Sequence, residues 1–147
     1  MGWPLPRIDH MLRRVGSQHP KYFAVMDLTS GYHQCPIDEE SMKYTSFRTS
    51  GGCYQWKRLP MGLKAAPAHF QQQMASTVLG PLLYDICEIY LDDVIIYGET
   101  EEEYLQNIEK VLKRFRECNI TTNPTKLLYN IQVTFYRQKD FHSTLPE

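Results

Sequence analysis

The sequence lacks the long apolar stretch that a membrane span would need. No apolar run in its 147 residues approaches the roughly 20 residues that cross a bilayer. The N-terminus also lacks the basic and apolar pattern of a secretion signal. The cysteines Cys35, Cys53, Cys87 and Cys118 contain no CxxC pair, so neither a zinc site nor a disulfide framework is indicated. We therefore expect an intracellular globular protein with free, buried thiols and no membrane partner.

Charge of one sign is missing from two long segments. Residues 41–84 carry five basic side chains and no acidic one, whereas residues 85–109 carry nine acidic side chains and no basic one. The net charge of -1 conceals this division. It indicates a surface for a polyanion beside a site for a cation. A solvated acidic face, above all at residues 101–103, would explain the second segment equally well.

A pair of adjacent carboxylates lies between two short runs of β-favouring residues. Residues 89–91 and 94–97 predict the strands of a β-hairpin, with Asp92 and Asp93 in its turn. Both side chains could project to one side of a tight turn, where two negative charges repel unless water or a cation screens them. A solvated turn is the alternative interpretation, because Asp is a common turn residue.

A third carboxylate, Asp27, stands near the end of the apolar run 22–28. A continuous run with aromatic and branched residues predicts a buried central strand, so Asp27 is expected at a strand end beside the mouth of the sheet. Asp27 could instead cap the turn at residues 29–31 by accepting hydrogen bonds from backbone N–H groups.

Helical spacing of apolar residues predicts three helices, at residues 7–15, 67–79 and 100–118. The third begins with a capping box, in which Thr100 is followed by Glu103. Its predicted buried stripe consists of Leu105, Ile108, Val111, Leu112 and Phe115.

A second hairpin is predicted from residues 43–49 and 53–57, joined by the turn at residues 50–52. Residues 120–136 are expected to add one or two edge strands. The order of elements predicts an α+β fold, an antiparallel sheet with helices on one face and a split βαβ, ferredoxin-like character. In that fold Asp27 and Asp92 can meet on adjacent strands.

Three motifs together resemble those of reverse transcriptases, in the same order and with the same spacing. They are FAVMDLTSGYHQ at residues 23–34, LPMGLKAAPAHFQ at residues 59–71 and YLDD at residues 90–93. They are most similar to the polymerases of gypsy-type LTR retrotransposons, and the resemblance extends over residues 3–126.

The resemblance implies a polymerase palm with part of the fingers at residues 1–130, and a fingers hairpin at about residues 41–58. Residues 131–147 fit the family poorly and are expected to be a frayed tail. The thumb and RNase H regions of the parent polyprotein are expected to be missing, as in an incomplete retrotransposon-derived copy. A cytoplasmic particle or the nucleus is the location implied.

The activity implied is RNA-directed DNA polymerisation, the template-directed transfer of nucleotides from dNTPs by a two-metal mechanism. Such transfer uses two cations about 3.5–4 Å apart. Two Mg²⁺ ions are implied, with Mn²⁺ as a substitute, because oxygen ligands suit them. By resemblance the metal ligands are the carboxylates of Asp27, Asp92 and Asp93 and the carbonyl of Leu28, with Asp93 second in importance.

Further roles follow from the same resemblance. Tyr32 matches an aromatic gate beneath the deoxyribose, Met61 and Gly62 line the nucleotide and template, and Tyr90 lies near the primer end. Lys126 matches a lysine that protonates the leaving pyrophosphate. A core tyrosine and a solvated lysine are the alternative interpretations. Contacts to the phosphates of an RNA or DNA template with its primer are implied for Lys43, Arg48, Lys57 and Arg58.

Two other functions remain open from the sequence. One is a non-catalytic reverse-transcriptase remnant that binds nucleic acid or a protein partner. The other is an RNA-templated RNA polymerase palm, which shares the paired carboxylates. The intact Asp27, Asp92 and Asp93 argue against long decay, and Tyr32 with the motif at residues 59–71 favours DNA synthesis.

Overall fold

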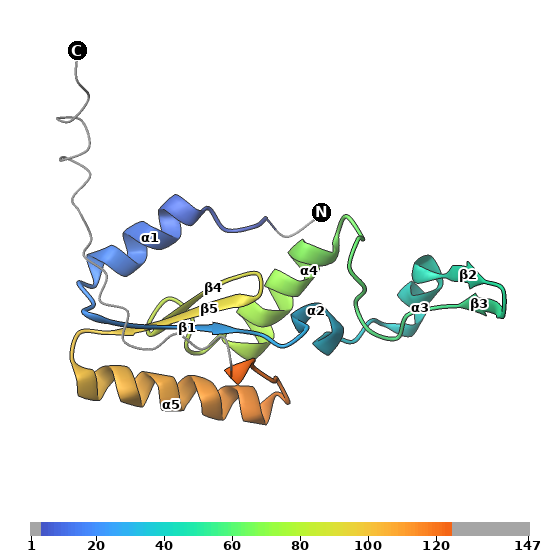
Figure 1. Ribbon diagram of the computed structural model, residues 1–147. Helices are drawn as coiled ribbons and strands as arrows, with labels where there is room; N and C mark the ends of the chain where they lie inside the picture. The colour runs from blue at the N-terminus through green and yellow to red at the C-terminus, as the bar shows by residue number, and fades with distance from the viewer. Residues whose placement is uncertain (1–3, 125–147) are drawn as a thin grey trace, which may run out of the picture.

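The structure, a computed structural model, describes residues 4–124 (Figure 1). Lys126, the predicted tail and most of the segment 120–136 lie outside the described residues. In chain order the elements are α1 (Ile8–Ser17), β1 (Tyr22–Asp27), α2 (Gly31–Gln34), α3 (Glu39–Met42), the 3₁₀ turn η1 (Lys43–Thr45), β2 (Phe47–Thr49), β3 (Gly52–Tyr54), α4 (Ala66–Gln72), the π-helical η2 (Gln73–Val78), β4 (Cys87–Tyr90), β5 (Asp93–Gly98) and α5 (Glu101–Glu117).

Among residues 4–124, the main sheet has three antiparallel strands in the order β1-β5-β4. The sequence predicted β1 as the central strand, but in this part of the chain β5 is central and β1 lies at an edge. Near the end of β1, Leu28 forms an isolated antiparallel bridge with Thr122. The apolar run of β1 is continuous because side chains are buried on both faces of the strand. A continuous apolar run therefore indicates that both faces of the strand are buried. It does not indicate whether the strand is central or at an edge.

Different helices cover the two faces of this sheet, and Figure 1 shows α1 and α5 on opposite sides of it. On one face Phe23 and Tyr97 pack against Val15 of α1. The other face is packed by α5 and by the helix formed of α4 and η2, so the prediction of two helices on one face is confirmed. Helix α1, which the sequence also predicted, covers the opposite face. The buried residues of that face and its helices include Ala24, Met26, Val94, Ile96, Phe70, Met74, Tyr104, Val111 and Phe115.

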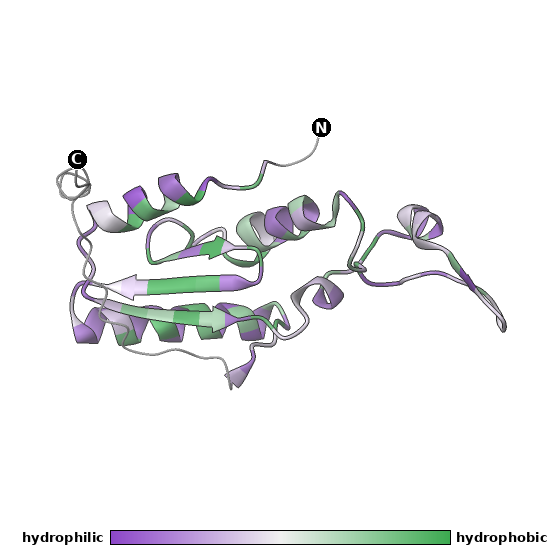
Figure 2. Cartoon of the chain, turned by 45° about the horizontal axis from the view of Figure 1, so that its top comes forward, coloured by the Kyte–Doolittle hydropathy of each residue, from purple (hydrophilic) through white to green (hydrophobic). Residues whose placement is uncertain are grey.

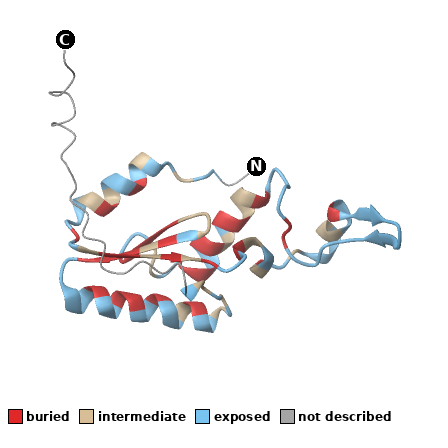
Figure 3. Cartoon of the chain, in the orientation of Figure 1, coloured by how far each residue is buried: buried red, intermediate tan, exposed pale blue. Residues whose placement is uncertain are grey.

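The buried surfaces follow the strands and the inward sides of the helices (Figure 3). In α5 the predicted stripe is correct for Ile108, Val111 and Phe115 but wrong for Leu105, which is 56% exposed, and for Leu112. Tyr104 is buried instead, and its hydroxyl donates to the backbone oxygen of Phe23 at 3.2 Å. The buried face of α5 therefore includes Tyr104, whose hydroxyl is hydrogen-bonded, and is rotated from the face that the aliphatic residues alone predicted.

Hydrogen bonds explain where α5 begins and where the helix of α4 changes to π-helical geometry. The capping box of α5 is confirmed, because the Thr100 hydroxyl accepts the N–H of Glu103 at 3.2 Å. The predicted helix at residues 67–79 is also present, but its second half is π-helical: the N–H of Leu79 donates to the oxygen of Met74, five residues earlier, at 2.8 Å.

The second hairpin, β2–β3, is shorter than predicted, and Figure 1 shows it as an arm that extends away from the sheet. Residues 43–45 form the turn η1 and not a strand. Asp38 caps the preceding helix by accepting the N–H of Ser41 at 2.9 Å, and helical backbone then continues into η1.

All four cysteines are free. Cys35 and Cys87 are buried as predicted, whereas Cys53 is exposed because the two-stranded arm has no core of its own. Within residues 4–124, no helix combines the length and apolar content that crossing a membrane requires.

An ion pair between the partly exposed Arg14 and the buried Glu88 joins α1 to strand β4. Glu88 is 1% exposed, and the guanidinium of Arg14 donates to its two carboxylate oxygens at 2.7 and 3.0 Å. The same guanidinium lies 4.5 Å from the centre of the Tyr84 ring. The charge of Glu88 is therefore balanced by a two-pronged contact that fixes α1 on the sheet.

We predict that Arg14→Ala lowers the free energy of unfolding by about 3–5 kcal/mol, because it leaves a buried carboxylate unpaired. The neighbouring exposed Arg13 provides the control, and Arg13→Ala should change stability by no more than about 0.5 kcal/mol. Urea denaturation followed by circular dichroism measures both. Equal effects of the two substitutions would contradict the structural importance of the pair.

Candidate active site

The hairpin β4–β5 turns through two residues, Leu91 and Asp92. Tyr90 pairs with Asp93, so Asp93 is the first residue of β5 and the prediction that it lies in the turn is wrong. Leu91 has a φ of 54°, in the left-handed region of the backbone. A left-handed backbone at a residue with a Cβ costs roughly 1–2 kcal/mol. Contacts around the turn must offset that cost.

Strand β1 brings the third carboxylate to this turn. Asp27 and Asp93 are direct partners in the antiparallel register, and the N–H of Leu28 donates to the backbone oxygen of Asp92 at 3.0 Å. Cα atoms of direct antiparallel partners lie about 4.5–5.5 Å apart. The three carboxylates therefore gather at one end of the sheet. The strand partner of Asp27 is Asp93 and not Asp92 as the sequence predicted, because Asp92 lies in the turn.

This end of the sheet is open to solvent. Alternation along the strands puts Asp27 and Asp93 on the same face as Phe23 and Tyr97, where α1 covers only the far end. Asp27 is half-buried and Asp93 is exposed. Figure 2 shows the hydrophilic start of β5 beside the end of β1. A ligand can therefore reach the carboxylates from the uncovered part of this face.

The side chain of Asp92 lies against Gly31. Its Oδ1 atom is buried, and a Cβ on Gly31 would overlap it and come within 2.9 Å of Cζ of Phe70. Tyr32 stacks on Phe70 with ring centres 4.9 Å apart. Burial raises the pKa of Tyr32, and the charge of Asp92 raises it further. The Asp92 carboxylate thus lies against Gly31, and Tyr32, which stacks on Phe70, lies near enough to be affected by its charge.

The donor set suits a hard divalent cation, since carboxylate and carbonyl oxygens are the ligands that Mg²⁺ prefers. Within residues 4–124, no group of three or more His, Cys, Asp or Glu side chains is arranged to enclose an ion. An open pair of carboxylates suits an ion that keeps waters and takes further ligands from a phosphate substrate. Asp27 and Asp92 could hold such an ion, with the carbonyl of Leu28 and the carboxylate of Asp93 beside them.

Of the other predicted site residues, Tyr90 lies closest to the carboxylates, because it ends β4 directly opposite Asp93. Met61 and Gly62 lie in an exposed loop before α4. Gly62 has a φ of 92°, which a residue without a Cβ adopts freely.

The predicted phosphate-binding residues do not join this cluster. Lys43, Arg48, Lys57 and Arg58 are exposed and lie in or beside the β2–β3 arm. Arg58 also has a structural contact, because its guanidinium donates to the backbone oxygen of Gln34 at 3.0 Å.

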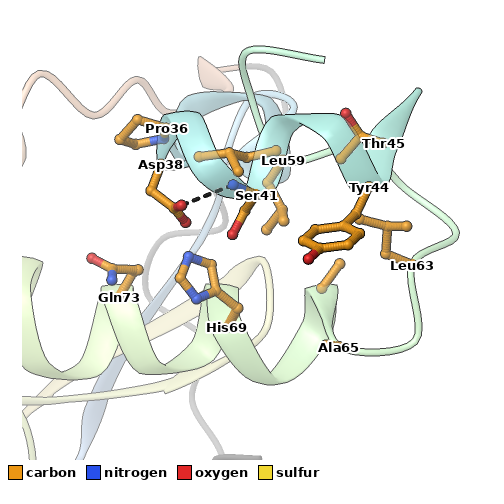
Figure 4. Close-up of a pocket in the computed structure, with 12 residues that line it drawn as sticks. Pro36, Asp38, Ser41, Tyr44, Thr45, Leu59, Leu63, Ala65, His69 and Gln73 are labelled. Carbon is orange, nitrogen blue, oxygen red and sulfur yellow. Dashed lines mark hydrogen bonds between the residues drawn. The ribbon is translucent and has the colours of Figure 1, made fainter. Parts of the chain in front are cut away.

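A cavity of about 410 Å³ lies between the base of the arm and α4 (Figure 4). None of the predicted site residues lines it. Figure 4 shows His69 and Gln73 of the helix pointing toward Asp38. The cavity is therefore separate from the carboxylate cluster. Its lining consists of Pro36, Ile37, Asp38, Ser41, Tyr44, Thr45, Leu59, Leu63, Ala65, Ala66, His69 and Gln73.

Sequence reasoning missed two residues that contact the hairpin turn. Gly31 was interpreted only as part of a turn, and its close approach to Asp92 depends on the packing of distant segments. Gln71 bonds to the backbone of Ile89 in β4 and of Leu91, the first residue of the turn. A signal for it was present, since it is a polar residue beside Phe70 on the apolar face of a predicted helix.

Antiparallel strands that bring Asp27 to an Asp92-Asp93 hairpin, backed by two helices, define a polymerase palm. The comparison with protein families agrees, since residues 2–135 match the reverse transcriptase (RNA-dependent DNA polymerase) family. The chain belongs to this family, a family of nucleotidyltransferases.

The curated relatives are retrotransposon polyproteins. The chain is 41% identical over 138 residues to the retrovirus-related Pol polyprotein from transposon 412 of Drosophila melanogaster, covering 93% of the chain and 11% of that protein. It is 38% identical over 124 residues to the corresponding polyprotein from transposon gypsy, covering 84% of the chain and 12% of that protein. The chain thus spans about a tenth of the length of these relatives.

Solved structures give the same result. The foamy viral protease-reverse transcriptase in complex with double-stranded DNA has a TM-score of 0.68 at 29% identity, covering 83% of this chain and 22% of that one. The same viral enzyme in complex with an RNA/DNA hybrid has a TM-score of 0.66 at 30% identity, covering 74% and 14%. The fold prediction is therefore confirmed.

We predict that Gly31→Ala destabilises the fold by about 1–3 kcal/mol and displaces Asp92, because the added Cβ overlaps its carboxylate. The matched control is Gly16→Ala in α1, where a Cβ meets nothing within 4 Å. That change should be neutral or stabilising by up to about 1 kcal/mol, since Ala favours helix. Denaturation gives the energies, and the amide shifts of residues 91–93 report the displacement. A neutral Gly31→Ala with unmoved shifts would refute the close packing.

Proposed function

We propose that this chain is the palm, with part of the fingers, of an RNA-directed DNA polymerase that extends a primer with dNTPs by a two-metal mechanism. The observation that carries the proposal is the pairing of Asp27 with Asp93, together with the bond from the N–H of Leu28 to the oxygen of Asp92. These contacts put carboxylates from two strands around one open site. Family membership supplies the reaction class.

Asp27 and Asp92 are the proposed bridging ligands, because Asp27 ends β1 and Asp92 lies in the β4–β5 turn beside it. Leu28 follows Asp27 directly and would add its backbone carbonyl. Asp93 is more exposed and would adjust the field and the orientation of the site. When bound, two Mg²⁺ ions (or Mn²⁺) would activate the primer 3′-hydroxyl and neutralise charge on the triphosphate.

The remaining proposed contacts surround this centre. Tyr32, held on Phe70 beside Asp92, would reject a ribose 2′-hydroxyl by steric overlap. Tyr90, opposite Asp93, would contact the primer end. The exposed loop of Met61 and Gly62 would line the nucleotide and template. Lys126 is proposed to protonate the leaving pyrophosphate.

Template and primer are the proposed macromolecular partners. The viral enzymes of similar fold were solved with an RNA/DNA hybrid and with double-stranded DNA, which supports a nucleic-acid partner here. We assign phosphate contacts to the exposed basic side chains in and beside the β2–β3 arm. Such contacts would not depend on the nucleotide sequence of the template. The basic side chains are Lys43, Arg48, Lys57 and Arg58. Since the relatives are Pol polyproteins, we also propose that the palm acts together with polyprotein regions for the thumb and RNase H.

Titration with Mn²⁺ tests the metal site directly. We predict weak binding by the chain, since substrate phosphates normally complete the coordination, and broadening of NMR signals centred on residues 27 and 92. Asp92→Asn should weaken binding about tenfold or more, because affinity depends on the number of charged ligands. The exposed Asp85 offers the control, and Asp85→Asn should leave the affinity unchanged. The same broadening in Asp92→Asn as in the wild type would refute the assignment.

The proposed role of Tyr32 in rejecting ribonucleotides is tested in the parent polymerase. We predict that Tyr32→Ala raises the ratio of kcat/KM for a ribonucleotide to that for the matched deoxyribonucleotide by about tenfold or more, because removing the ring makes room for the 2′-hydroxyl. Tyr32→Phe keeps the ring and should preserve the ratio. Steady-state primer extension with each nucleotide measures it. If Tyr32→Ala leaves the ratio unchanged, Tyr32 serves only the stack with Phe70.

A further inference from the structure

We infer that Gln71 of α4 is a positioning residue for the turn that carries Asp92. Its carboxamide bonds to the backbone of β4 and of the first turn residue, and thereby sets where the Asp92 carboxylate lies. The inference deepens the proposed function and rests on it for its consequence in metal binding, whereas the positioning itself is a property of the fold.

The carboxamide of Gln71 makes two hydrogen bonds to the backbone, one as a donor and one as an acceptor. Nε2 of Gln71 donates to the backbone oxygen of Ile89 at 2.9 Å, and its Oε1 accepts the N–H of Leu91 at 2.8 Å. The residue is 3% exposed. Only one orientation of the amide works, because a flip would set Nε2 against the N–H of Leu91 and Oε1 against the carbonyl of Ile89.

These two backbone groups lie at the edge of the sheet. Strand β4 is bonded to β5 on one side and is an edge strand in the order β1-β5-β4. Gln71 therefore takes the place of a neighbouring strand for the last part of β4 and the turn. On the other side, the N–H of Leu28 donates to the oxygen of Asp92. The turn is held from two directions.

The turn requires such support because Leu91 has a φ of 54°. An unsupported residue with a Cβ would leave this conformation easily. Gln71 is rigid enough to supply the support, since Phe70 beside it and Met74 one turn later are buried in the core. Phe70 also stacks on Tyr32. Helix α4 thus contacts both Tyr32 and the β4–β5 turn.

The test compares Gln71→Met, which keeps the length and removes both hydrogen bonds, with Gln72→Met, a change at the exposed neighbour on the same helix. In Gln71→Met, hydrogen exchange at the Leu91 amide should accelerate at least about tenfold more than exchange at Ile96 in the central strand. Mn²⁺ affinity should fall about tenfold, as for residues that orient metal ligands. Gln72→Met should change neither quantity.

A conservative variant separates positioning from bulk stability. Gln71→Glu keeps an oxygen for the N–H of Leu91, so the Leu91 amide shift should stay near its wild-type value, whereas it should move in Gln71→Met. In the wild type, the side-chain amide protons of Gln71 should exchange more slowly than those of Gln72. That last measurement needs no substitution and holds even where a variant does not fold.

The outcomes distinguish the two ideas. If the wild type binds no Mn²⁺, the proposed metal site fails, while the exchange of Leu91 still decides the role of Gln71. If the wild type binds Mn²⁺ and Gln71→Met changes neither that affinity nor the exchange of Leu91 relative to Ile96, the positioning role is refuted. Equally fast exchange of the side-chain amides of Gln71 and Gln72 would refute it as well.

Discussion

The pairing of β1 with β5 is the interaction on which the rest of the structure depends. Its register sets Asp27 opposite Asp93, and the same register buries Ala24 and Ile96 on one face and Phe23 and Tyr97 on the other. A slip of one residue would move every side chain of a strand to the opposite face. Core packing on both faces therefore fixes Asp27 opposite Asp93.

The sheet handles its acidic side chains in two different ways. Glu88 is buried in an edge strand, where its charge is balanced by the guanidinium of Arg14 at 2.7 Å. Asp27 and Asp93 lie at the open end instead, where water or a cation can reach them. Like charges at the latter place are tolerable because they are solvated, and a divalent ion would convert their repulsion into attraction. One carboxylate thus stabilises the fold while the others remain available to a ligand.

The sequence predicted the features that local patterns determine: the β4–β5 hairpin, the capping box at Thr100, and the helix of α4 and η2. It was wrong where distant segments decide. Asp93 pairs in the strand because the loop has two residues, and Tyr104 replaces Leu105 in the core because its hydroxyl finds a carbonyl in β1. The two bonds of Gln71 depend on how α4 packs on the sheet, so its polar position on an apolar helix face was the signal that the sequence offered.

The three sequence motifs have a common physical basis, which is that all of them contact one turn. The first supplies the N–H of Leu28 and the space at Gly31, and the second supplies the carboxamide of Gln71. The third is the turn itself, with Asp92 held between them. The contacts reach different atoms, which are the N–H of Leu91, the carbonyl of Asp92 and its carboxylate. Correct placement of the Asp92 carboxylate therefore requires all three segments, although only the first and third supply carboxylates.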